Sequence, residues 1–189
     1  MNLDSRECVS RQQPTTFIKT SSSIDLRATR GILNTLLYLS PTRHLLYVTD
    51  TSGTLPSRRF EHLSCFYPGL LALGVHSLAN DPSVPEYDKS LHRWAAEGLA
   101  HTCWTMYGES ESGLGPEVAL FRSAFLAGVP ITKIFTQRWM SHVQGWEAQG
   151  SPGEKPPGVA HLAELVMNDS GVDRDYSIRE ASYLLRPEV

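Results

Sequence analysis

Glu61, His62 and Cys65 stand directly ahead of an apolar run that begins at Pro68. A carboxylate can bind hydroxyl groups or transfer protons, an imidazole can donate or accept a hydrogen bond, and a thiol can pair or bind metal. Polar groups at the mouth of a helix built for burial are what a binding site on a helical scaffold needs. The alternative interpretation is a structural helix start that happens to carry a histidine. This motif alone does not distinguish a binding site from such a helix start.

The cysteines are Cys8, Cys65 and Cys103, an odd number without the spacing of a zinc ribbon or a thioredoxin motif. If a disulfide exists, Cys65 and Cys103 are the expected pair, because both lie in segments with helical patterns. Two buried free thiols are an alternative. A metal site of His62, Cys65, His101 and Cys103 is another, but His101 and Cys103 would point away from each other on a helix.

Composition excludes several classes of protein. The chain has 189 residues, of which 41% are hydrophobic, enough for one ordinary domain with a core. Its net charge is -3 and no basic face is evident, so a nucleic-acid partner is not expected. No apolar run approaches the roughly 20 residues that cross a bilayer, and the first residues lack the apolar core of a signal peptide.

Apolar residues at helical spacing predict several helices. One runs from Ser22 or Ser23 to Leu39 and is stopped by Pro41. Another covers about residues 68–78, and the longest covers about residues 87–106. Because a short loop containing proline joins the last two, they should form an antiparallel αα-hairpin.

Other segments predict strands and loops. The β-branched and aromatic stretch His44–Asp50 is typical of a strand, and it should pair with residues near 57–60 in a small β-hairpin. Residues 149–158 have the composition of a flexible linker.

Three motifs follow one another in a fixed order: residues 61–74, the turn Ser112–Glu117 and the segment Tyr183–Glu188. Each motif is weak alone, but the ordered set closely resembles glycoside hydrolase family 47, the class I α-1,2-mannosidases. The similarity covers about residues 24–117 and again 175–189, whereas 118–173 looks like an insertion.

The resemblance implies a mainly α fold, part of an (αα)7 barrel of helical hairpins with a small β-hairpin. Residues 1–189 would form a single, partial catalytic domain of the family. The implied enzyme is a glycosidase that removes terminal α-1,2-linked mannose from high-mannose N-glycans with inversion. Calcium is the implied cofactor. The implied location is the lumen of the endoplasmic reticulum or Golgi, with membrane association only through segments outside this chain.

The resemblance also assigns site residues. Glu188 falls on the proposed general base and Arg186 on the neighbouring substrate-binding arginine, while Glu61 and His62 fall on pocket-lining positions. Glu117 falls on the acidic residue of the Gly-Pro-Glu turn, although a carboxylate at a helix start, favoured by the helix dipole, explains it equally well. An inverting glycosidase needs two carboxyl groups about 6.5 to 9.5 Å apart, and Glu188 can fill one role, held ionised by Arg186.

The sequence also departs from the family. Cys65 and Cys103 fall on the family's disulfide pair, but the residues proposed as general acid lie upstream of the His62 motif, in helices that this chain does not contain. The calcium-anchoring motif lies beyond Val189, so no metal ligand is assigned here. These departures predict an internal fragment that is inactive by itself. A lectin-like, mannose-binding module without catalysis is the alternative function.

Overall fold

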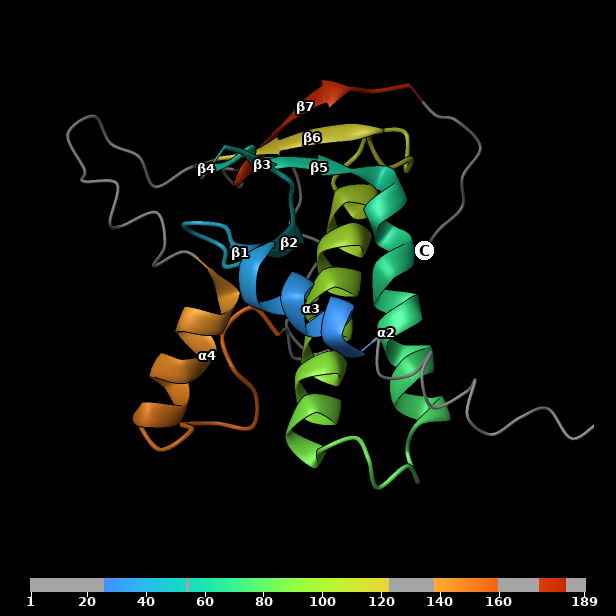
Figure 1. The fold of residues 1–189 in the computed structure, drawn as a ribbon. Helices are drawn as coiled ribbons and strands as arrows, with labels where there is room; N and C mark the ends of the chain where they lie inside the picture. Colours follow the sequence, from blue (N-terminus) through green and yellow to red (C-terminus); the bar gives the residue numbers. More distant parts are fainter. Residues whose placement is uncertain (1–25, 54, 123–137, 160–173, 183–189) are drawn as a thin grey trace, which may run out of the picture.

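The computed structural model of the chain describes residues 26–53, 55–122, 138–159 and 174–182 (Figure 1). Residues 26–35 are helical. The other elements, in chain order, are β1 (Leu37–Leu39), β2 (Leu46–Val48), β3 (Thr51–Ser52), β4 (Leu55–Pro56), β5 (Arg59–Glu61), η1 (His62–Cys65), α2 (Phe66–Ser77), α3 (Glu86–Gly108), β6 (Val118–Phe121), α4 (Trp139–Ala148) and β7 (Tyr176–Glu180). Within these ranges, each helix is too short or too polar to cross a membrane.

Helices α2 and α3 form the antiparallel αα-hairpin that the apolar spacing predicts, lying side by side in opposite directions (Figure 1). Helix α3 carries Glu86 and Asp88 in its first turn, where carboxylates interact favourably with the helix dipole. Its buried apolar side chains recur every three or four residues, at Leu91, Ala95, Leu99, Cys103 and Met106. Burial of this stripe holds α3 at the centre of the described structure.

The strands form small antiparallel sheets. β1 pairs with β2, β3 pairs with β4, and the third sheet has the order β5-β6-β7. The β5-β6-β7 sheet lies across the end of the αα-hairpin where α2 begins and α3 ends (Figure 1). It brings together segments that are far apart in the sequence.

The prediction of a mainly α fold, part of an (αα)7 barrel with a small β-hairpin, is wrong for the described residues. They form helices together with three small antiparallel sheets. The first helix ends at residue 35 instead of Leu39. The predicted pairing of residues 44–50 with 57–60 is also wrong, because β2 pairs with β1 and β5 pairs with β6.

The physical reason is that β1 is buried on both of its faces. Leu37 and Leu39 pack into a core cluster with α3 and α4, whereas Tyr38 packs into a second cluster with Phe60 and Phe121. An amphipathic surface helix buries one stripe, so consecutive buried side chains are better accommodated by a strand between two layers. From the sequence alone, Leu36 and Leu39 continue the helical pattern of the preceding residues. The second apolar cluster, which receives Tyr38, favours a strand instead.

A carboxylate buried beside the β1–β2 turn attaches β7 to it. Asp175, which is 1% exposed, accepts hydrogen bonds from the Ser40 hydroxyl at 2.5 Å and from the backbone N–H groups of Thr42 at 3.0 Å and Arg43 at 2.6 Å. Next to it, the Tyr176 hydroxyl donates to Glu109 at the end of α3. Burial, followed by this contact with Glu109, raises the pKa of Tyr176.

Two glycines inside helices give a matched test of the packing. A Cβ at Gly98 of α3 would lie 2.4 Å from the Gly158 carbonyl oxygen and 2.8 Å from Leu46 Cδ2, whereas a Cβ at Gly145 of α4 would meet no atom within 4 Å. Gly98→Ala is therefore expected to lower the free energy of unfolding by about 1–3 kcal/mol through overpacking. Gly145→Ala should raise it by about 0.5–1 kcal/mol because alanine favours a helix. Urea unfolding checks both, and equal effects at the two positions would contradict this packing.

Candidate functional site

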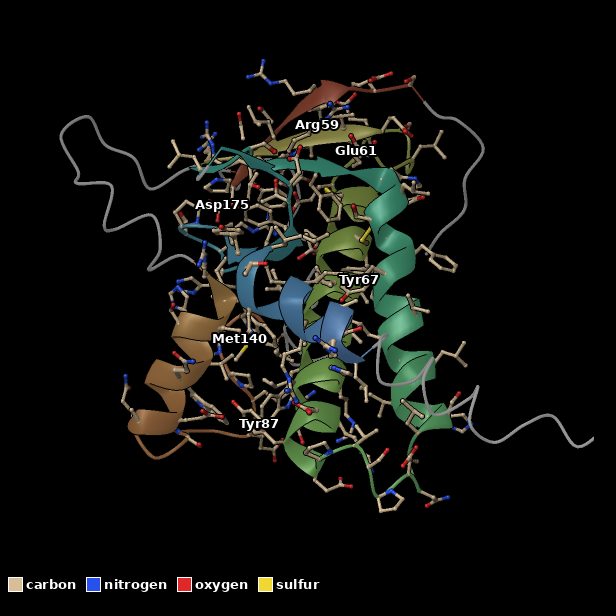
Figure 2. All side chains as sticks on the ribbon, viewed as in Figure 1. Arg59, Glu61, Tyr67, Tyr87, Met140 and Asp175 are labelled. Carbon is tan, nitrogen blue, oxygen red and sulfur yellow. A yellow bond between two sulfur atoms is a disulfide. The ribbon has the colours of Figure 1, made fainter. Side chains whose placement is uncertain are left out.

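Strand β5 places Glu61 and Arg59 on one face. The intervening Phe60 is 1% exposed and points into the core, so the alternation of a strand directs its two neighbours outward. Arg59 and Glu61 lie close to where α2 begins (Figure 2), and their charged groups are 3.0 Å apart. Both side chains are about half exposed, at 53% and 51%. This ion pair is therefore accessible to a ligand.

Two of the sequence motifs meet at this strand. β5 pairs with β6 so that Glu61 is opposite Val118. The next backbone N–H, that of His62, donates to the carbonyl oxygen of Glu117 at 2.9 Å. Glu117 itself is partly buried. The structure thus brings Glu61, His62 and Glu117 to one end of the αα-hairpin.

His62 is buried, with 2% of its surface exposed. Its Nε2 lies 2.5 Å from the hydroxyl oxygen of Tyr107, and the two ring centroids are 5.5 Å apart. The imidazole thus packs against α3, and its backbone bonds to the turn that carries Glu117. Glu61 and His62 are adjacent in the chain but face different surroundings.

A hollow of about 290 Å³ lies beside Glu61. Charged groups, hydroxyls and apolar side chains line it, from Leu36, Val48, Thr49, Asp50, Arg59, Glu61 and Ser64. Carboxylates accept hydrogen bonds from hydroxyl groups, a guanidinium donates them, and apolar side chains can cover a C–H surface. The hollow therefore has the chemistry to hold a polyhydroxylated molecule such as a sugar.

Two predicted site residues, Arg186 and Glu188, lie outside the described residues, as does the whole of their motif, residues 183–188. The predicted disulfide is confirmed: Cys65 at the end of η1 is bonded to Cys103 of α3, with the Cα atoms 5.9 Å apart.

The disulfide rules out the alternative of a four-ligand metal site, since it consumes both thiols of that set. Across the described ranges, no group of three or more His, Cys, Asp and Glu side chains could hold a metal ion. The described residues thus do not supply a calcium site of the carboxylate-rich kind that this ion prefers.

Sequence reasoning missed Asp50, Arg59 and Tyr107. The signal for Arg59 was present, because it stands two positions before Glu61 and a strand places both on one face. Tyr107 could also have been found. It follows Cys103 by one helical turn, so a Cys65–Cys103 bond brings it towards His62. Asp50 carries no local signal, since its place in the hollow depends on how β2 and β5 pack.

Several known proteins are similar to part of this sequence. An endoplasmic reticulum mannosyl-oligosaccharide 1,2-alpha-mannosidase of Rattus norvegicus is 39% identical over 97 residues, which is 51% of this chain and 13% of the rat protein. A mannosyl-oligosaccharide 1,2-alpha-mannosidase of Arabidopsis thaliana is 33% identical over 110 residues, 52% of this chain and 17% of that protein. The endoplasmic reticulum enzyme of the same name from Saccharomyces cerevisiae is 34% identical over 105 residues, 50% of this chain and 19% of that protein.

The chain thus spans less than a fifth of the length of these relatives, whose matched shares are 13%, 17% and 19%. The sequence profile described as Glycosyl hydrolase family 47 covers much more of it, matching residues 24–189. That match includes all three motifs and every residue assigned to the site. The chain belongs to glycosyl hydrolase family 47.

Proposed function

We propose that this chain is part of an α-1,2-mannosidase that removes terminal mannose from high-mannose N-glycans with inversion, in the lumen of the endoplasmic reticulum or Golgi. Family membership over residues 24–189 and the names of the relatives support the activity and the location. The observation that carries the proposal is that Glu61 lines a sugar-sized hollow, while the next residue, His62, is bonded to the backbone of Glu117 from a second motif. Their motifs are separate in the sequence.

Each proposed residue has a role that fits its chemistry. Glu61 borders the hollow and would accept hydrogen bonds from sugar hydroxyls, with Asp50 as a second carboxylate on the same hollow. Glu117 would contribute to the same pocket as the acidic residue of the second motif. His62, buried against Tyr107, would hold the backbone next to Glu61 in place. Glu188 would act as the general base that removes a proton from the attacking water, and Arg186 would keep it ionised and bind the sugar.

The proposal includes calcium only through the family. Two carboxylates, Asp50 and Glu61, line the hollow, and the described residues contain no group of three or more possible metal ligands. No catalytic step is therefore derived through the ion. Calcium dependence is a property to measure on the purified protein.

The test is the release of mannose from α-1,2-mannobiose by the purified protein, with the binding of mannobiose measured beside it. The protein should release mannose as the β-anomer, which proton NMR detects before the anomers equilibrate. Absence of release would overturn the mannosidase proposal.

Glu188→Gln gives a residue-level prediction in the same assay. It should lower the rate of mannose release at least about a hundredfold, since a glutamine cannot accept the proton of the attacking water. Mannobiose binding should change much less, because the amide still makes hydrogen bonds. The matched control is Glu180→Gln, at the exposed end of β7. An unchanged rate in Glu188→Gln would remove Glu188 from the role of base.

A non-catalytic mannose-binding module is the second candidate, and the lining of the hollow favours it. Asp50, Arg59 and Glu61 provide acceptors and donors for a sugar without any proton transfer. A purified protein that binds mannobiose and releases no mannose would establish this candidate in place of the enzyme.

A further inference from the structure

Tyr107 touches both motifs that meet at the proposed sugar site. Its hydroxyl oxygen lies 2.5 Å from Nε2 of His62. Its ring lies against Gly115 of the Ser112–Glu117 turn, where an added Cβ would be 2.8 Å from Cε2 and 3.1 Å from Cδ2 of the ring. One side chain of α3 therefore fills the space between the two motifs.

Backbone bonding closes this arrangement into a ring of contacts. The His62 N–H donates to the Glu117 carbonyl, so His62 and Glu117 are joined directly as well as through Tyr107 and Gly115. The disulfide from Cys103, one helical turn before Tyr107, holds the same segment of α3 against η1. The backbone that carries Glu61 and Glu117 is thus joined on both sides to a single aromatic ring.

We infer that Tyr107 is a positioning residue of the proposed sugar site, which holds His62 in one ring orientation and sets the place of Glu117 relative to Glu61. The inference rests on the proposed function. A phenol hydroxyl can donate to an imidazole nitrogen or accept from it, so its bond to Nε2 holds the His62 ring in one orientation in either tautomer. The absence of a side chain at Gly115 lets the turn approach the ring closely enough to complete the contact.

Tyr107→Phe removes the hydroxyl and keeps the ring that packs on Gly115. Gly115→Ala keeps the hydroxyl and displaces the ring, since the new methyl group would overlap Cε2. The matched control is Tyr176→Phe, which removes another buried tyrosine hydroxyl, bonded to Glu109 at 2.8 Å. It should lower stability about as much as Tyr107→Phe, without touching His62.

Two measurements on the purified protein test the inference. The first is the ¹⁵N NMR spectrum of the histidine rings, in which the His62 Nε2 signal should shift in Tyr107→Phe and stay unchanged in Tyr176→Phe. The second is the affinity for α-1,2-mannobiose by NMR titration. It should fall about five- to tenfold in Tyr107→Phe and in Gly115→Ala, and less than twofold in Tyr176→Phe.

The outcomes separate this inference from the proposed function. If the unsubstituted protein neither binds nor cleaves mannobiose, the proposed function fails and the inference fails with it. If the chain binds and Tyr107→Phe has the same affinity, the inference alone is overturned. An equal loss of affinity in Tyr107→Phe and Tyr176→Phe would also overturn it, because a general loss of stability would then explain both.

Discussion

Asp175→Ala is expected to lower the free energy of unfolding by about 2–4 kcal/mol, because it leaves the buried Ser40 hydroxyl and two part-buried backbone N–H groups without their acceptor. The Asp175 carboxylate accepts from the Ser40 hydroxyl and from the backbone N–H groups of Thr42 and Arg43. Each unsatisfied buried donor costs about 1–3 kcal/mol. Since a domain of this size has a total stability of about 5–15 kcal/mol, the loss would be a large part of it.

Urea unfolding followed by circular dichroism measures this effect. Asp175→Asn should cost less than Asp175→Ala, because one side-chain oxygen remains as an acceptor. The exposed Glu154 provides a matched control, and Glu154→Ala should stay within about 0.5 kcal/mol of the unsubstituted chain. A loss below about 1 kcal/mol for Asp175→Ala would contradict the role of this carboxylate in joining β7 to the β1–β2 turn.

The same carboxylate predicts a pH dependence. Burial by itself raises the pKa of Asp175, but the hydrogen bonds from Arg43, Ser40 and Thr42 outweigh burial and hold the pKa below the ordinary value of 3.8. A depressed pKa in the folded state means that the carboxylate stabilises the fold fully above its unfolded pKa. This contribution should disappear as the pH falls below about 4, through the folded pKa. Asp175→Asn should flatten that part of the stability curve, and an unchanged curve would contradict the assignment.

Removing the disulfide is the second large effect. The bond joins residues separated by 38 positions, and closing a loop of that length stabilises the fold by about 4 kcal/mol through the entropy of the unfolded chain. Cys65 and Cys103 are 2% and 0% exposed, so Cys65→Ala combined with Cys103→Ala also leaves buried space between η1 and α3. The double variant should therefore lose at least about 4 kcal/mol in urea unfolding.

Two controls make this prediction specific. Cys8→Ser should leave stability unchanged, since Cys8 takes no part in the bond. Adding a reductant should destabilise the unsubstituted chain and have no effect on the double variant. If the double variant were as stable as the unsubstituted chain, the bond would not be holding η1 against α3, and the proposed approach of His62 to Tyr107 would lose its main support.

The sequence predicts the αα-hairpin and the disulfide because their causes are local or follow from the resemblance. The apolar stripe from Leu91 to Met106 has the helical period whatever surrounds it, and the loop before it contains Pro82 and Pro85. The three motifs identify the family from residue order alone, and that order suffices to name Glu61, His62 and Glu117 as candidate site residues. How far apart these residues lie in space is not contained in that order.

Only the tertiary structure decided the sheets. Leu36 and Leu39 have the spacing of a helical stripe. Residues 37–39 form a strand instead, because separate core clusters receive its two faces. β6 and β7 pair with β5 through contacts between distant segments, which no local pattern specifies. The first helix therefore ends earlier than its periodicity predicts.

The roles of Glu61, His62 and Cys65 were likewise decided by the tertiary structure. By itself, the sequence determined that Glu61, His62 and Cys65 precede an apolar helix and that the chain resembles a mannosidase family. The tertiary structure decided what each side chain does: Glu61 faces a hollow with Asp50 and Arg59, His62 is buried against Tyr107, and Cys65 is bonded to Cys103. The physical reason is that residue type and spacing set the available chemistry, whereas burial and partners depend on segments that only folding brings together.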